Sequence, residues 1–190
     1  DAIYLLGDVF EAWIGDDAIQ PPADALAQAL KALNDAGVAV YFIHGNRDFL
    51  LGPDYAERAG MRLLPDPAVI DLYGTATIIQ HGDLLCTQDV AYQRFRQQVR
   101  SPDWQRAVLA RPLAERQVMA QQMRAQSVAA QAGGVVYADI DAPLAREWLM
   151  AARARTLIHG HIHRPGDHAL GHDASGRPLQ QVVLSDWHIA

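Results

Sequence analysis

Cysteine is almost absent from this chain: among 190 residues only Cys86 carries a thiol. One cysteine excludes a disulfide within the chain, argues against a thiolate metal site and fits a reducing compartment. No apolar run approaches the roughly 20 residues that span a bilayer, and no signal peptide is visible. The formal net charge of −6 argues against a general nucleic-acid binder. These absences leave an ordinary globular composition, with a length that suits one domain over residues 1–190.

Both ends of the chain look cut. The sequence opens at Asp1, directly before an apolar run and without an initiator methionine. It stops at Ala190, shortly after another apolar run. We therefore expect the chain to be truncated at both ends.

Apolar runs and helical periodicity alternate in the first part of the chain. Ile3–Leu6 and Val38–Ile43 are typical of buried strands. Between them, Pro21 opens a helix that ends before Gly37, and three leucines mark its apolar face (Leu26, Leu30 and Leu33). A strand, a helix and a strand in this order predict a βαβ unit with parallel strands.

The second part of the chain continues this α/β pattern. Further strands are expected at Ala76–Gln80, Thr156–Ile158 and Val182–Leu184, and a helix at Ala142–Ala152. Residues 89–131 are largely helical, with breaks at Pro102 and Pro112, and form a candidate insertion. The fold class is therefore predicted to be α/β with a helical insertion.

The insertion is strongly basic. Seven arginines lie between residues 94 and 124, against only two acidic residues, Asp103 and Glu115. One interpretation is a solvated helical face. The other is a basic cap over an anionic substrate or a membrane surface.

Four predicted strands each end in a polar cluster. The clusters are Gly7-Asp8, Gly45-Asn46-Arg47-Asp48, His81-Gly82-Asp83 and Gly160-His161-Ile162-His163. Ligands of open α/β sheets gather at the carboxyl ends of strands, so these clusters can converge. Singly, each has an ordinary explanation, such as a turn or a hydrogen-bonded core histidine. Together, their Asp, Asn and His side chains are typical donors for Mn²⁺, Fe²⁺ or Zn²⁺ and predict a metal site.

In this order the clusters resemble the calcineurin-like metallophosphoesterases. The family pattern is Asp-x-His, Gly-Asp, Gly-Asn-His-Asp/Glu, His and Gly-His-x-His. The resemblance implies a sandwich of mixed β-sheets flanked by helices. Two departures stand out: the opening Asp-x-His is absent, and Arg47 replaces the histidine of the third motif.

Three longer stretches of sequence restrict the resemblance to one group within this family. Gly7–Asp17, His44–Gly52 and His81–Thr87 are similar to the UDP-2,3-diacylglucosamine diphosphatases of lipid A biosynthesis. This resemblance implies that residues 89–131 are a lid over the active site. It also implies hydrolysis of the substrate pyrophosphate at the α-phosphorus, giving UMP and 2,3-diacylglucosamine 1-phosphate.

The resemblance also implies a centre of two Mn²⁺ ions. Asp8 would bridge both ions, and His163 would bind the first together with the absent Asp and His. The second ion would be held by Asn46, His81 and His161. The implied catalytic residues are Asp8, Asn46, Arg47 and His161.

Arg47 fits this chemistry, because a permanently charged fork neutralises charge that builds on phosphate in the transition state. The alternative for Arg47 is a surface salt bridge with Asp48.

The resemblance carries substrate contacts over to Asn46, Arg47 and His161 and, in the insertion, to Asp89, Ser127 and Gln131. Gln131 stands where that family has asparagine, and Gly134 stands where it has lysine. An apolar stripe is a candidate groove for acyl chains, with ordinary helix packing as its alternative; it consists of Trp104, Val108, Leu109, Leu113, Val118, Met119 and Met123.

The expected partners are a lipid-nucleotide substrate and an anionic membrane surface, with no nucleic acid and a monomeric protein. The resemblance places such an enzyme peripherally on the cytoplasmic face of the bacterial inner membrane. Two alternatives remain open: a metallophosphoesterase acting on a soluble nucleotide or phosphoprotein, and a non-catalytic scaffold of the same fold.

Overall fold

The computed structural model describes residues 1–19, 21–132 and 139–185, with side chains described for all of these except 126–132. The chain divides into two compact units. Unit 1 comprises Asp1–Leu63 and Ala91–Tyr137, and unit 2 comprises Leu64–Val90 and Ala138–Ala190. No helix in the described part of the chain is long and apolar enough to cross a membrane.

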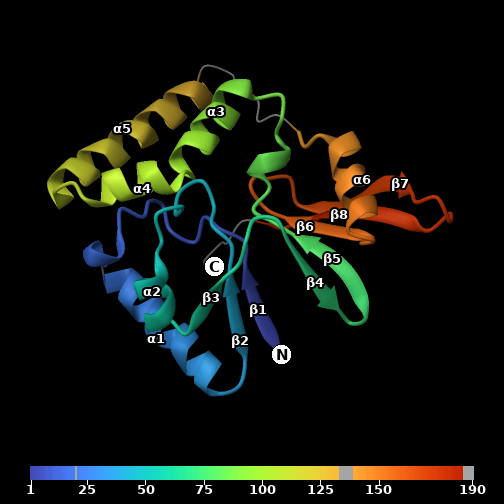
Figure 1. Cartoon of the computed structure of the whole chain (residues 1–190), viewed down its shortest axis with the longest axis horizontal. Helices are drawn as coiled ribbons and strands as arrows, with labels where there is room; N and C mark the ends of the chain where they lie inside the picture. The colour runs from blue at the N-terminus through green and yellow to red at the C-terminus, as the bar shows by residue number, and fades with distance from the viewer. Residues whose placement is uncertain (20, 133–138, 186–190) are drawn as a thin grey trace. The chain divides into compact units, whose positions relative to one another are not determined.

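Unit 1 contains a parallel sheet of three strands in the order β1-β2-β3. The strands are β1 (Ala2–Leu5), β2 (Ala39–Phe42) and β3 (Met61–Leu63), connected by helices α1 (Pro21–Asp35) and α2 (Pro53–Arg58). Figure 1 shows both helices on the same side of this sheet. The pairing of β1 with β2 is parallel, which confirms the predicted βαβ unit.

The core of unit 1 lies between this sheet and its helices. Val40 and Phe42 of β2 are almost fully buried, and Tyr55 of α2 is fully buried. On α1 the buried face runs through Ala23, Ala27 and Leu30. The prediction that Leu33 shares this face is wrong, because Leu33 lies in the last helical turn, beyond the buried residues, and is 40% exposed.

A distant carboxylate anchors the start of α2. Asp16 Oδ1 accepts from the Gly52 N–H at 2.9 Å, and Asp16 Oδ2 accepts from the Tyr55 N–H at 2.9 Å. The Trp13 indole N–H also donates to Asp16, at 2.9 Å. A Cβ on Gly52 would lie 2.7 Å from Asp16 Oδ2, so this approach needs glycine. Asp16 thus satisfies backbone donors at the first turn of α2.

The insertion consists of three consecutive helices (Figure 1). They are α3 (Val90–Val99), α4 (Pro102–Leu109) and α5 (Leu113–Ala132), which confirms the predicted breaks at Pro102 and Pro112. Ser101 caps α4, with its side chain accepting from the Trp104 N–H. Val99 and Val108 are buried in the core of unit 1.

Arginines attach the insertion to the rest of unit 1. Arg100 donates to the carbonyl oxygens of His44 and Gly45 at 3.0 and 2.9 Å. Arg116, only 3% exposed, donates to the Ile14 carbonyl at 2.6 Å and pairs with Asp17. A solvated helical face therefore does not describe these two residues, whose guanidinium groups satisfy carbonyls within the unit.

Unit 2 is built on a mixed sheet of five strands in the order β4-β5-β6-β8-β7. The strands are β4 (Ala68–Leu72), β5 (Thr75–Ile79), β6 (Thr156–His159), β7 (Gly166–His172) and β8 (Pro178–Val183), with helix α6 (Ala142–Ala151). β5 and β8 both pair parallel to β6, whereas β4–β5 and β7–β8 are antiparallel hairpins. Ala145 and Leu149 of α6 are fully buried in the same core as Leu157 of β6.

The sequence patterns missed α2, β3, β4 and β7. β7 carries two glycines and two histidines in seven residues, so apolar alternation is weak there. β4 is followed by a tight hairpin turn to β5, in which Tyr73 and Gly74 have φ values of 52° and 79°. Both strands are secured by pairing with a partner strand, which is not a local property of the chain.

We expect Cys86 to resist alkylation in the folded protein. Burial, followed by the nearby carboxylate of Asp83, raises the pKa of the Cys86 thiol to about 12. At pH 8 only about one thiol in 10⁴ is therefore ionised. Modification by iodoacetamide at pH 8, followed by mass spectrometry, should be slow in the native protein and fast in urea. Equal rates in both conditions would contradict this environment for the thiol.

Candidate metal centre

In unit 1, the first polar cluster follows β1. Gly7 and Asp8 adopt positive φ values of 84° and 54°, which turn the chain sharply after the strand. Asp8 Oδ1 accepts a hydrogen bond from the Arg47 N–H at 2.9 Å. A Cβ on Gly45 would lie 2.2 Å from the same oxygen, so only glycine admits the Asp8 carboxylate here. The first and second clusters are therefore in direct contact.

The Asp48 side chain connects the two clusters through hydrogen bonds to their backbone. This carboxylate is fully buried. Its Oδ2 accepts from the Val9 N–H at 2.9 Å, and its Oδ1 accepts from the Gly45 N–H at 2.7 Å. Val9 follows Asp8 in the chain, and Gly45 precedes Asn46, so one buried carboxylate fixes the backbone beside both predicted ligands.

Arg47 lies beside these ligands with its side chain about one-third exposed. Its Nε is 3.6 Å from Asp8 Oδ2, and its Nη1 is 3.0 Å from Glu11 Oε2. Both oxygens of Asp48 accept from backbone donors, and the ion pairs of Arg47 lead to Asp8 and Glu11. Glu11 was not among the predicted site residues.

In unit 2, the other two clusters also meet. His81 follows β5, and His161 follows β6. Nδ1 of His161 lies 3.2 Å from Nε2 of His81, and the Gly160 N–H donates to the His81 carbonyl at 2.9 Å. A Cβ on Gly82 would lie 2.8 Å from the His159 ring and 2.9 Å from the Gly160 carbonyl, so glycine again permits the approach. Two imidazole nitrogens at this separation are placed as two ligands of one cation would be.

A buried pair supports this arrangement. His159, fully buried at the end of β6, lies with Nε2 3.0 Å from the side-chain amide nitrogen of Gln181 and Nδ1 2.8 Å from the Gly160 carbonyl. An imidazole protonated on Nδ1 satisfies both contacts, donating to the carbonyl and accepting from Gln181. Neither residue was predicted as functional. The run His159-Gly160-His161-Ile162-His163 placed His159 beside the site, but only pairing of β6 with β8 brings Gln181 to it.

The environments of His159 and His161 favour the neutral form of both rings. Desolvation, followed by the adjacent His81, lowers the pKa of His161 to about 3. Desolvation also lowers the pKa of His159. At neutral pH the His161 ring is therefore uncharged, which is the form of imidazole that binds a metal.

Backbone strain coincides with the predicted ligands. Five non-glycine residues of the described chain have positive φ, and three of them are Asp8 (54°), His161 (67°) and His163 (53°). Such conformations are unfavourable for side chains with a Cβ, and they concentrate at functional sites. Asp8, Asn46 and Arg47 thus gather in unit 1, while His81 and His161 gather in unit 2 with His163 two residues further along. The oxygen donors in unit 1 and the nitrogen donors in unit 2 are each of a type that binds divalent transition metals.

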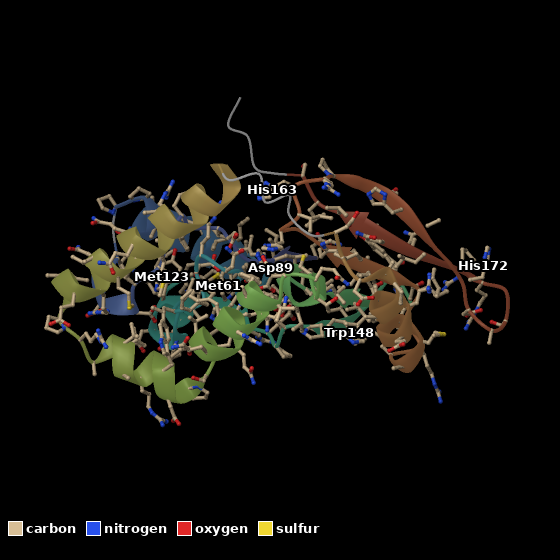
Figure 2. The ribbon with its side chains drawn as sticks, turned by 90° about the horizontal axis from the view of Figure 1, so that it is seen from above. Met61, Asp89, Met123, Trp148, His163 and His172 are labelled. Atoms are coloured by element: carbon tan, nitrogen blue, oxygen red, sulfur yellow. The ribbon has the colours of Figure 1, made fainter. Side chains whose placement is uncertain are left out.

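The predicted substrate contacts of the insertion fall in different places. Asp89 is partly buried and immediately precedes α3 (Figure 2). Ser127 and Gln131 belong to α5, but their side chains lie outside the described residues, as does Gly134 altogether. In Figure 2, His163 and His172 lie toward opposite ends of β7, so His172 is remote from the ligand cluster of unit 2.

The predicted apolar stripe divides into two parts, apart from Met123, which is partly buried. Trp104, Val108 and Met119 pack against the core of unit 1, so ordinary helix packing is the correct interpretation for them. Leu109, Leu113 and Val118 remain 41%, 37% and 52% exposed. Val118 and Met119 also line an open groove of about 420 Å³ along α5, together with Arg111, Glu115 and Gln122.

Comparison with known proteins gives a consistent result. The family model described as Calcineurin-like phosphoesterase matches residues 1–165. A Stenotrophomonas maltophilia protein named UDP-2,3-diacylglucosamine hydrolase is 52% identical over 201 residues, covering 99% of this chain and 78% of its own length. Proteins of the same name from Cellvibrio japonicus and Xanthomonas campestris are each 50% identical, over 98% and 99% of this chain and 78% of their own lengths.

Proposed function

The chain belongs to the calcineurin-like phosphoesterase family and is a hydrolase, and we propose that it cleaves the pyrophosphate of UDP-2,3-diacylglucosamine with two Mn²⁺ ions. The observation that carries the substrate assignment is the sequence identity of 50–52% over nearly the whole chain to proteins named UDP-2,3-diacylglucosamine hydrolase. The positive φ values of Asp8, His161 and His163 support the metal assignment. In this proposal, residues 1–190 act as one phosphoesterase domain.

The proposed ligands come from both units. Asp8 would bridge the two ions, Asn46, His81 and His161 would hold one of them, and His163 would hold the other. When bound, a pair of divalent cations supplies an activated water and neutralises phosphoryl charge. Hydrolysis of the pyrophosphate at the α-phosphorus would give UMP and 2,3-diacylglucosamine 1-phosphate.

Arg47 has a separate role in this proposal. Its backbone N–H donates to Asp8 and its guanidinium pairs with Asp8 and Glu11, so the guanidinium would stabilise the negative charge that develops on the phosphoryl oxygens. Arginine does not release a proton near neutral pH, so it is a poor general acid. The leaving group is itself a phosphate, which requires little protonation, so arginine in place of histidine is compatible with this reaction.

The insertion would form the substrate lid. Asp89, Ser127 and Gln131 would be substrate contacts, in addition to Asn46, Arg47 and His161. The exposed side chains of Leu109, Leu113 and Val118, near Arg111 and the groove on α5, supply the apolar and cationic surface that acyl chains and an anionic membrane require. A peripheral position on the cytoplasmic face of the inner membrane follows from this proposal.

A product assay tests the proposed function. The full-length protein, freed of metal by EDTA and then given Mn²⁺, should convert UDP-2,3-diacylglucosamine to UMP and the lipid phosphate. Without added metal, the rate should fall by at least about 100-fold, because two-metal hydrolysis depends on the cations for both attack and charge neutralisation. Mass spectrometry in ¹⁸O-water should place the label in UMP. Turnover of a dinucleoside polyphosphate but not of the lipid nucleotide would support the soluble-substrate alternative instead.

A further inference from the structure

Glu11 connects the site arginine with the insertion. Its Oε2 lies 3.0 Å from Arg47 Nη1 and 2.8 Å from Arg124 Nη1. Arg47 follows β2, whereas Arg124 lies on α5, the helix that also carries Ser127 and Gln131. A single carboxylate oxygen therefore forms ion pairs with two guanidinium groups that come from different parts of unit 1.

The segment that carries Glu11 is anchored on both sides. Before it, the Val9 N–H donates to Asp48 at 2.9 Å. After it, the Trp13 N–H donates to the Arg47 carbonyl at 3.0 Å, and the Trp13 side chain is buried. Residues 9–13 thus span two backbone attachments at the site, so Glu11 is presented from a fixed position although its side chain is 65% exposed.

Stability does not explain this arrangement. Exposed ion pairs contribute on the order of 0–1 kcal/mol, because water screens the charges and ordering the side chains costs entropy. Two guanidinium groups close together also repel each other, and a shared carboxylate is the group that offsets this repulsion. The effect of Glu11 is geometric, because it holds the guanidinium groups of Arg47 and Arg124 around one anionic oxygen. The same arrangement of donors also suits a phosphate oxygen.

We propose that Glu11 is a positioning residue that holds Arg47 and Arg124 as a paired guanidinium site for the phosphate of the substrate. The inference rests on the proposed function for the identity of the substrate. Fixing both side chains before the substrate arrives lowers the entropy lost when the phosphate binds. Glu11 also ties the distal part of α5 to Arg47, so binding of the lipid portion by the insertion and binding of phosphate at the site are coupled through one side chain.

Kinetic constants of Glu11→Ala test this role in the full-length protein. We expect KM for UDP-2,3-diacylglucosamine to rise about fivefold, the effect of losing two exposed charge pairs. The thermal midpoint should stay unchanged, because Glu11 is exposed. A merely structural defect would lower the apparent kcat and the thermal midpoint at constant KM. Glu11→Gln, which keeps an acceptor oxygen in place, should recover part of the loss.

A double-mutant cycle identifies the partner. In an Arg124→Ala background, Glu11→Ala should raise KM by less than it does in the wild type, since one of its two ion pairs is already gone. Asp103→Ala is the control, because it removes another exposed carboxylate that pairs with an insertion arginine, Arg106. This control should leave KM unchanged. Additive effects of Glu11→Ala and Arg124→Ala, or an unchanged or lower KM in Glu11→Ala, would overturn the proposal.

Binding of inorganic pyrophosphate to the metal-free protein separates this inference from the proposed function. Calorimetry should show weaker binding to Glu11→Ala than to the wild type and to Asp103→Ala. If the lipid nucleotide is not hydrolysed but pyrophosphate binding still depends on Glu11, the proposed substrate is wrong and the arginine pair stands. If the wild type hydrolyses the lipid nucleotide, but KM and pyrophosphate affinity are the same in Glu11→Ala as in the wild type, the proposed function is retained and the positioning role is rejected.

Discussion

Replacing Asp8 with alanine is expected to abolish turnover of UDP-2,3-diacylglucosamine, with kcat falling by about 10³-fold or more. Asp8 is the proposed bridging ligand, and its Oδ1 also accepts from the Arg47 N–H at 2.9 Å. Removing the carboxylate therefore removes the shared ligand and one constraint on Arg47. The measurement is kcat with saturating Mn²⁺, together with the number of Mn²⁺ ions bound per protein by metal analysis.

Two further variants separate loss of the ligand from loss of the fold. Asp8 has a φ of 54°, and alanine tolerates that conformation less well than aspartate or asparagine. Asp8→Asn keeps the backbone preference and an acceptor oxygen but lacks the charge, so it should also be inactive while folding normally. Asp35→Ala, which removes an exposed carboxylate paired with Lys31, should retain full activity. Wild-type rates in Asp8→Ala would reject the two-metal model.

Among these variants, replacing the buried Asp48 with alanine should lower the free energy of unfolding the most. In Asp48→Ala, the Val9 and Gly45 N–H groups lose their acceptor inside the protein. Leaving a buried donor unsatisfied costs about 1–3 kcal/mol, so the loss at buried Gly45 and partly buried Val9 should together lower the free energy of unfolding by up to about 6 kcal/mol. Urea denaturation monitored by circular dichroism measures this change.

Metal binding should also weaken in Asp48→Ala, even at temperatures where the variant is folded. The lost bonds hold the backbone next to Asp8 and Asn46, and a ligand that must be ordered on binding binds a cation less tightly. Calorimetric titration with Mn²⁺ tests this expectation. Glu57→Ala on the neighbouring helix α2 is the control, since Glu57 is exposed, and should change neither quantity. Full stability of Asp48→Ala would show that other groups replace its two hydrogen bonds.

The amino-acid sequence determined the features that depend on local pattern. Short apolar runs located β1, β2, β5 and β6. The prolines at 102 and 112 divided the insertion into the three helices that the structure shows. The ordered polar clusters identified the family, which the match over residues 1–165 confirms. Such features are encoded over a few neighbouring residues, because strand alternation, helix initiation and turn chemistry act at short range.

Tertiary structure alone decided which side chains meet across long separations. Arg116 bonds to the Ile14 carbonyl 102 positions away, and Arg124 shares Glu11 with Arg47, although in the sequence both arginines belong to one basic stretch. Gln181 reaches His159 only because β8 pairs with β6. Burial and partner choice depend on how distant segments fold against each other, so the local sequence identified the chemical groups of this site but not the contacts that hold them in place.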